Sequence, residues 1–123
     1  MKTDCLAQGE AYLKALNNKD LEAMGTYVHP DVKFKTPLVE SSSRHDFLVA
    51  TRHLVSQVKG VTVKSKFATE TQAMFTYDLM FEQPIGPTRT ASLMTFDHDK
   101  ITEIELFFDA RPFEKVSASQ PAK

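Results

Sequence analysis

The chain has 123 residues, a formal net charge of -1 and 41% hydrophobic residues, which predict one domain with a single core. The near-neutral charge, without a strongly basic region, argues against a nucleic-acid surface, and no apolar run approaches the roughly 20 residues that span a membrane. The single cysteine, Cys5, excludes an intramolecular disulfide and favours a reducing compartment. Because the N-terminus also lacks a hydrophobic leader, we expect a cytoplasmic protein.

Three helices are predicted in the first half of the chain. The first covers residues 3–17 with Thr3 as its N-cap, and its apolar stripe consists of Cys5, Gly9, Tyr12, Leu13 and Leu16. Asp20 is expected to cap a second, short helix. The third follows the polar loop 41–46, where Ser43 and Asp46 are spaced as at a helix N-terminus. Its apolar face consists of Phe47, Ala50, Leu54 and Val58, and Gly60 is expected to end it.

Alternating apolar side chains predict the strands. One strand runs from Val32 to Leu38, where Pro37 indicates an edge or an end. Four more are predicted over residues 61–67, 74–81, 89–96 and 100–108, with a hairpin loop at 84–87. This order predicts an α+β fold, a cone-shaped, cystatin-like roll in which N-terminal helices pack on a curved antiparallel sheet. The domain is expected to cover residues 1–116, and the small, polar residues 117–123 to form a flexible tail.

Three segments, in this order, carry a family resemblance: residues 16–21 (Leu-Asn-Asn-Lys-Asp-Leu), residues 27–32 (Tyr-Val-His-Pro-Asp-Val) and residues 107–113 (Phe-Phe-Asp-Ala-Arg-Pro-Phe). Together they resemble the nuclear transport factor 2-like superfamily, and more narrowly its SnoaL-like polyketide cyclase and ketosteroid isomerase branch. The resemblance extends from Leu6 to Phe113. It implies an apolar pocket for a small apolar or carbonyl-containing molecule and proton transfer next to a carbonyl. It implies no cofactor, and the sequence shows no metal motif.

The resemblance also suggests catalytic residues. Tyr12 matches the position of an oxyanion donor on the first helix of the isomerases, and Ser92 falls near their second donor. Their general base corresponds to Thr36, which cannot accept a proton as a carboxylate does, so steroid isomerisation is not expected. In the polyketide cyclases an Asp near the end of the last strand acts as acid and base, and Asp109 matches it.

Two interpretations of Asp109 remain open from the residues themselves. A carboxylate beside aromatic surface can be desolvated, which raises its pKa and suits it to acid–base work. Alternatively, Asp109 is bonded to Arg111 or caps a turn. Strict alternation turns Asp109 outward if Phe108 faces the cavity, so a bulge would be needed to bring the carboxylate inside.

The predicted pocket combines aromatic and small polar side chains on one sheet face. We expect it to be lined by Phe34, Thr36, His45, Phe47, Phe75, Tyr77, Met94, Leu106 and Phe108. His45, at the rim, could shuttle a proton. The pocket is interpreted as an isomerase, cyclase or lyase-type acid–base site, and the alternative is a non-catalytic ligand-binding or dimerisation module.

The opposite, convex sheet face predicts a homodimer. Its apolar side chains, Met74, Met80, Ala91, Leu93 and Phe107, alternate with polar ones. An apolar centre among polar groups is typical of an interface between two identical copies. Relatives of the family that the chain resembles commonly pair through this face.

Overall fold

The computed structural model describes residues 4–114 of the chain. In chain order the elements are α1 (Cys5–Asn17), α2 (Leu21–Thr26), β1 (Val28–Lys35), β2 (Glu40–Ser41), α3 (Arg44–Gln57), β3 (Val58–Ala68), β4 (Gln72–Phe81), β5 (Pro87–Asp97) and β6 (Lys100–Phe107). A single helical turn follows over residues 111–114. The proposed boundary at residue 116 and the tail 117–123 lie outside the described residues.

Side-chain caps fix where the helices begin. Asp20 Oδ1 accepts from the backbone N–H of Ala23 at 3.0 Å, and Ser43 Oγ accepts from that of Asp46 at 3.1 Å, which confirms both predicted caps. On α1 the cap is Asp4, whose Oδ1 accepts from the N–H of Ala7 at 3.0 Å. The predicted cap Thr3 lies outside the described residues. Each cap satisfies a backbone donor that the first helical turn leaves unpaired.

Helix α3 ends earlier than its apolar pattern predicted. It ends at Gln57, and Val58 already has extended backbone and is paired with Phe81 as the first residue of β3. Val58 is 2% exposed, so this β-branched side chain is buried by the sheet and not by a further helical turn. The chain therefore passes from α3 into β3 without a loop.

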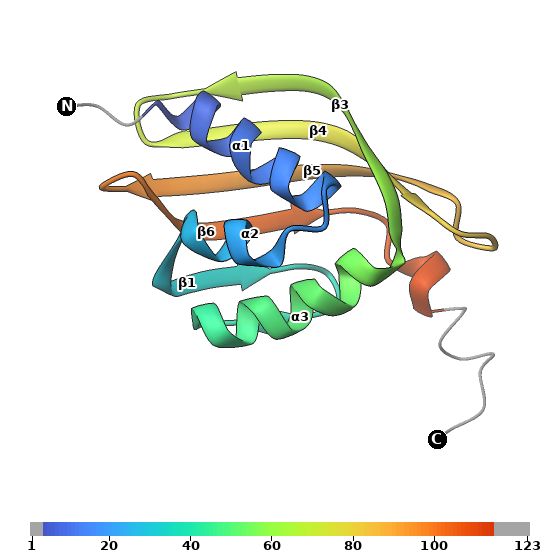
Figure 1. Ribbon diagram of the computed structural model, residues 1–123. Coiled ribbons are helices and arrows are strands. Elements are labelled where there is room, and N and C mark those ends of the chain that lie inside the picture. Colours follow the sequence, from blue (N-terminus) through green and yellow to red (C-terminus); the bar gives the residue numbers. More distant parts are fainter. Residues whose placement is uncertain (1–3, 115–123) are drawn as a thin grey trace.

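The curved sheet has the order β2-β1-β6-β5-β4-β3, and the three helices cover one side of it (Figure 1). The predicted α+β roll is thus confirmed. One strand pair differs from the predicted antiparallel arrangement, because β1 pairs with β6 in parallel, with Phe34 opposite Ile104. The sheet is therefore mixed, since the long connection through α3, β3, β4 and β5 brings β6 back alongside β1 in the same direction.

The concave face has the predicted register. Buried and half-buried residues alternate along β4 and β5; Phe75, Tyr77, Leu79, Ser92 and Met94 are all buried. Gly9 allows α1 to approach this face closely, because a Cβ there would lie 2.4 Å from Cε1 of Phe75 and 3.4 Å from Sδ of Met94. Helix α1 therefore closes the middle of the concave face. No helix within residues 4–114 has the length and apolar character needed to cross a membrane.

A candidate ligand-binding cavity

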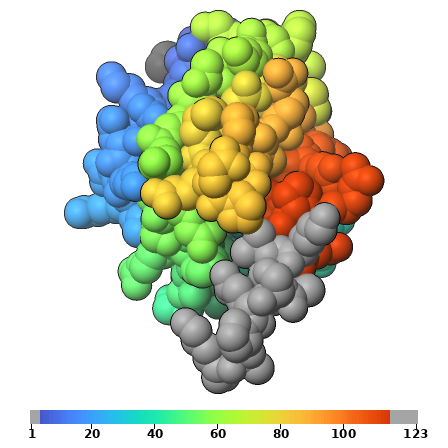
Figure 2. All heavy atoms as spheres, turned by 90° about the vertical axis from the view of Figure 1, so that its right-hand side faces the viewer, coloured from blue at the N-terminus to red at the C-terminus, as the bar shows by residue number. Residues whose placement is uncertain are grey.

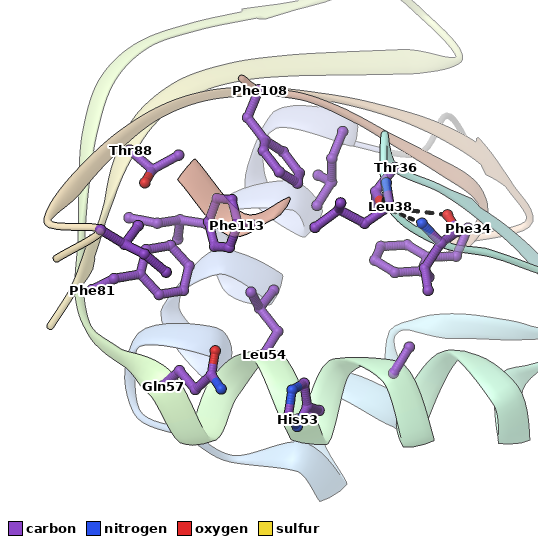
Figure 3. A pocket seen from close by; sticks show the side chains of 15 residues that line it. Phe34, Thr36, Leu38, His53, Leu54, Gln57, Phe81, Thr88, Phe108 and Phe113 are labelled. Carbon is purple, nitrogen blue, oxygen red and sulfur yellow. Dashed lines mark hydrogen bonds between the residues drawn. The ribbon is translucent and has the colours of Figure 1, made fainter. Parts of the chain in front are cut away.

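A cavity of about 380 Å³ lies where β4 ends and β5 begins, between the sheet and α3 (Figure 3). Its lining consists of Phe34, Thr36, Leu38, Val39, Ala50, His53, Leu54, Gln57, Leu79, Phe81, Ile85, Thr88, Leu106, Phe108 and Phe113. Small-molecule pockets typically have volumes of about 300–1,000 Å³, so this cavity suits a small ligand. Figure 2 shows this end of the molecule, with the β4–β5 loop in yellow, the residues leading up to 114 in orange-red and α3 in green.

Helix α3 has one stripe that faces the core and another that faces the cavity. The core stripe consists of Phe47, Thr51 and Val55, all buried. Ala50, His53, Leu54 and Gln57 form the second stripe at i, i+3, i+4 and i+7, which lies on one side of a helix. Leu54 points from α3 into the cavity in Figure 3.

Three phenylalanine rings form a wall across the cavity from α3. The ring of Phe113 meets that of Phe81 with centroids 5.1 Å apart and that of Phe108 with centroids 5.4 Å apart, both edge-to-face. Such edge-to-face arrangements are favourable between aromatic rings. Phe113 belongs to the helical turn 111–114, whose position therefore shapes this wall.

Four of the predicted pocket residues line the cavity: Phe34, Thr36, Leu106 and Phe108. The Thr36 hydroxyl is already occupied, because it accepts from the N–H groups of Leu38 at 3.0 Å and Val39 at 2.9 Å and donates to the Val39 carbonyl at 3.3 Å. A hydroxyl has one donor and two acceptor sites, so Thr36 holds its own loop and has none left for a ligand.

Six other predicted residues lie in the closed core beside the cavity and not in its lining: Tyr12, Phe47, Phe75, Tyr77, Ser92 and Met94. The ring of Phe34, at the cavity wall, meets that of Phe47 at 5.1 Å, and Phe47 in turn is 6.3 Å from the ring of Tyr12. Tyr12 is therefore separated from the cavity by Phe47 and Phe34. These core positions follow from α1, which covers the part of the sheet where the prediction placed the pocket.

The buried hydroxyls of Tyr12, Tyr77 and Ser92 influence one another behind that wall. Burial raises the pKa of Tyr77 to about 12, against a smaller lowering by the Ser92 hydroxyl. Burial also raises the pKa of Tyr12, and the nearby Tyr77 adds to that rise. Ser92 Oγ makes no hydrogen bond within residues 4–114, so its effect on the pKa of Tyr77 comes from the closeness of the two hydroxyls. Both phenols remain neutral donors at physiological pH.

Asp109 is exposed and forms a two-pronged pair with Arg111. Arg111 Nη2 lies 2.7 Å from Oδ2 and Nε lies 2.9 Å from Oδ1, and Oδ1 also accepts from the Arg111 N–H at 3.0 Å. The carboxylate is not part of the cavity lining, so the acid–base arrangement, which needed Asp109 inside the cavity, is not the one that the structure has. Strand β6 ends at Phe107, and Asp109 is bonded to Arg111, which is the second of the two arrangements that the sequence left open.

This pair predicts a measurable titration. Hydrogen bonds from Arg111 hold the pKa of Asp109 at about 2, below its ordinary value of 3.8. Arg111→Gln is expected to return the pKa of Asp109 toward that value. The carbon chemical shift of its carboxyl group, recorded by NMR across the pH range, measures this pKa. A depressed folded pKa stabilises the fold above the ordinary pKa, and the contribution is lost as the pH falls from about 4 toward 2. An unchanged pKa in the variant would show that Arg111 is not the cause.

His53, and not His45, is the histidine of the cavity. Both histidines are exposed, but His45, in the first turn of α3, is outside the lining, whereas His53, one turn before Gln57, is part of it. Helical spacing could have identified His53, because it follows Ala50 at i+3 as Leu54 does at i+4, and these positions share one side of a helix. Leu38 shares the period-two alternation of Phe34 and Thr36, which could have identified it, whereas Val39, Ile85 and Phe113, from loops and the final turn, carry no periodic signal. Within residues 4–114 no three or more His, Cys, Asp or Glu side chains gather as metal ligands.

A family model described as the SnoaL-like domain matches residues 10–104. The chain belongs to the SnoaL-like domain family. A protein from Kribbella flavida has a similar structure, with a TM-score of 0.87, 23% identity and 94% of each chain covered. An NTF2-like protein from Cytophaga hutchinsonii has a TM-score of 0.79 and 16% identity, with 93% of this chain and 97% of that chain covered.

Enzymes also occur among the similar structures of this SnoaL-like chain. An LEH-like epoxide hydrolase from M. tuberculosis has a TM-score of 0.74 and 18% identity, with 93% of this chain and 89% of that chain covered. Other structures are named as ketosteroid isomerase and polyketide cyclase relatives. At these identities the likeness establishes the fold alone. The curated proteins give no significant match.

Proposed function

We propose that this SnoaL-like protein binds a small, largely apolar molecule in the cavity beside α3. The observation that carries the proposal is the lining itself, in which aliphatic and phenylalanine side chains surround a few polar groups. Apolar walls with a small number of placed polar groups are typical of small-molecule sites. The wall of Phe81, Phe108 and Phe113 suits a flat, ring-shaped body.

Binding without catalysis is favoured because no carboxylate lines the cavity within residues 4–114. Catalysis through Asp109 would require the carboxylate to leave Arg111 and turn into the cavity. It would also require the substrate oxygen to reach Tyr12 and Ser92, which lie in the closed core outside the lining. The second candidate function is proton transfer next to a carbonyl, of the isomerase or cyclase type, with His53 as the base. His53 supports it as the lining's titratable side chain, since imidazole can exchange protons near neutral pH.

Titration with naphthyl methyl ketone, a flat neutral probe, tests the proposal. In amide NMR spectra we expect saturable shifts concentrated on α3, the β4–β5 loop and residues 106–113. Native mass spectrometry of freshly purified protein should also detect any small molecule that co-purifies. Shifts that spread over the convex sheet face, or no saturable binding, would contradict the proposed site.

We also propose that the chain forms a homodimer through the convex sheet face. Phe107 is 45% exposed at the end of β6, and Ala91 is paired with it on β5. Met74, Met80 and Leu93 are half-buried on the same face. A partner copy would cover this apolar group, since large exposed apolar patches are unusual on monomers.

Phe107→Glu is expected to dissociate this dimer, because burying an unpaired carboxylate at an interface costs several kcal/mol. Light scattering at micromolar concentration should give a dimer mass for the parent chain and a monomer mass for the variant. Val49→Glu is the matched control, since Val49 is 56% exposed on α3, on the opposite side of the sheet from the proposed interface. A parent chain that is already monomeric would refute the dimer.

A further inference from the structure

Two neighbouring polar side chains on α3, both exposed at the rim of the cavity, have no partner among the described residues. Within residues 4–114, the side chains of His53 and Gln57 make no hydrogen bond or ion pair, although both line the cavity. They are four residues apart on α3, a spacing that places two side chains side by side, about 5–6 Å apart at Cβ. Imidazole and carboxamide can each donate a hydrogen bond, so the pair can converge on one ligand oxygen.

The other polar groups near the cavity are less suited to this role. The hydroxyl of Thr36 is saturated by its own loop. Tyr12 is buried and outside the lining, and its ring is joined to the cavity wall only through the contacts of Phe47 with Tyr12 and with Phe34 among the ring contacts of the described residues. Thr88 is 8% exposed and lies across the cavity from α3 in Figure 3, so its hydroxyl, which also has no partner within residues 4–114, offers one donor without a neighbouring second one. The two donors that lie side by side are therefore those on α3.

The charges around the cavity disfavour an anionic ligand. Its lining, within the described residues, contains no Lys, Arg, Asp or Glu, so a cation to pair with an anion could come only from a protonated His53. An unpaired charge that leaves water for such a site loses its hydration at a high free-energy cost. Gln57 is also the last residue of α3, where backbone carbonyls give the helix end a partial negative charge.

We infer that His53 and Gln57 are the specificity-determining pair of the cavity, and that they bind the acceptor oxygen of an uncharged ligand whose apolar body packs on the wall of Phe81, Phe108 and Phe113. The inference rests on the proposed ligand-binding function and adds the orientation and charge class of the ligand. A carbonyl, ester or hydroxyl oxygen meets this requirement, whereas a carboxylate does not. The oxygen then lies on the side of α3, away from Tyr12 and Ser92.

Three probes of similar shape separate the inference from the function on which it rests. Naphthyl methyl ketone carries an uncharged acceptor oxygen, ethylnaphthalene lacks it, and naphthoate carries a negative charge. Dissociation constants for each are measured by NMR titration with the parent chain and with His53→Phe and Gln57→Leu, which remove the donors and keep apolar bulk. Arg52→Leu is the matched control, since Arg52 is an exposed neighbour on α3 outside the lining.

We expect the parent chain to bind the ketone about 3–10-fold more tightly than ethylnaphthalene, as one or two hydrogen bonds provide, and naphthoate most weakly. Each cavity variant should remove most of the preference for the ketone while binding ethylnaphthalene as before, and Arg52→Leu should keep it. Equal affinity for ketone and hydrocarbon, a preference for naphthoate, or a preference that survives both variants would overturn the inference and leave the binding function intact. Failure of all three probes would contradict the function itself, and the inference with it.

Discussion

Phe47→Ala is expected to lower the free energy of unfolding by about 3–5 kcal/mol, the cost typical of deleting a buried aromatic ring. Phe47 is fully buried, and its ring contacts Phe34 on β1 and Tyr12 on α1. One side chain thus joins α3 to two other elements, and its loss leaves a void between them. Domains of this size have total stabilities of about 5–15 kcal/mol, so a large part of the fold's stability would be removed.

Urea denaturation followed by circular dichroism measures this loss. Phe67→Ala is the matched control, because Phe67 is 64% exposed on β3 and its removal should change the stability by less than about 0.5 kcal/mol. If both variants lost the same small amount, Phe47 could not be a central contact of the core. A void beside Phe34 should also weaken ligand binding, because Phe34 is part of the cavity wall.

Leu54→Trp is expected to weaken binding of naphthyl methyl ketone about 10–100-fold. Leu54 points from α3 into the cavity, so a larger ring there takes the volume that the ligand needs, and overpacking of this kind costs about 1–3 kcal/mol. Val49→Trp is the matched control, since Val49 is 56% exposed on the same helix and outside the lining. Isothermal titration calorimetry measures both variants, and equal affinities would place the ligand elsewhere.

The elements that could be predicted from the sequence are those governed by local chemistry. Asp20 and Ser43 begin helices because their oxygens accept from nearby backbone N–H groups, which short sequence patterns reveal. Period-two alternation correctly placed Phe75, Tyr77 and Met94 on the concave face, because a strand's side chains point to opposite sides in turn.

The position of the cavity depends on tertiary packing, which alternation does not contain. Gly9 brings α1 onto Phe75, so the middle of the concave face is filled and the end near Leu79 and Phe81 stays open. Alternation identifies the face but not the position along it where a helix stops covering it. Phe113 and Ile85 reach the cavity from a terminal turn and a loop, where no periodicity exists to indicate them.

Asp109 illustrates the same limit for a candidate catalytic group. Its place beside Phe108 at a strand end allowed both a desolvated acid and an ion-paired one. The choice depends on the direction of the backbone after Phe107, and the structure pairs Asp109 with Arg111 in solvent. The carboxylate binds Arg111, the first residue of the helical turn that carries Phe113, and Phe113 is part of the cavity wall.

Intermolecular nuclear Overhauser effects between naphthyl methyl ketone and isotopically labelled protein test the central claim most directly, because they locate the ligand. The proposed site requires contacts from the naphthalene ring to the side chains of Leu54, Phe108 and Phe113, with the methyl ketone group near His53. Contacts confined to Met74, Leu93 and Phe107 on the convex face, or saturable binding without any contact to the cavity, would contradict it.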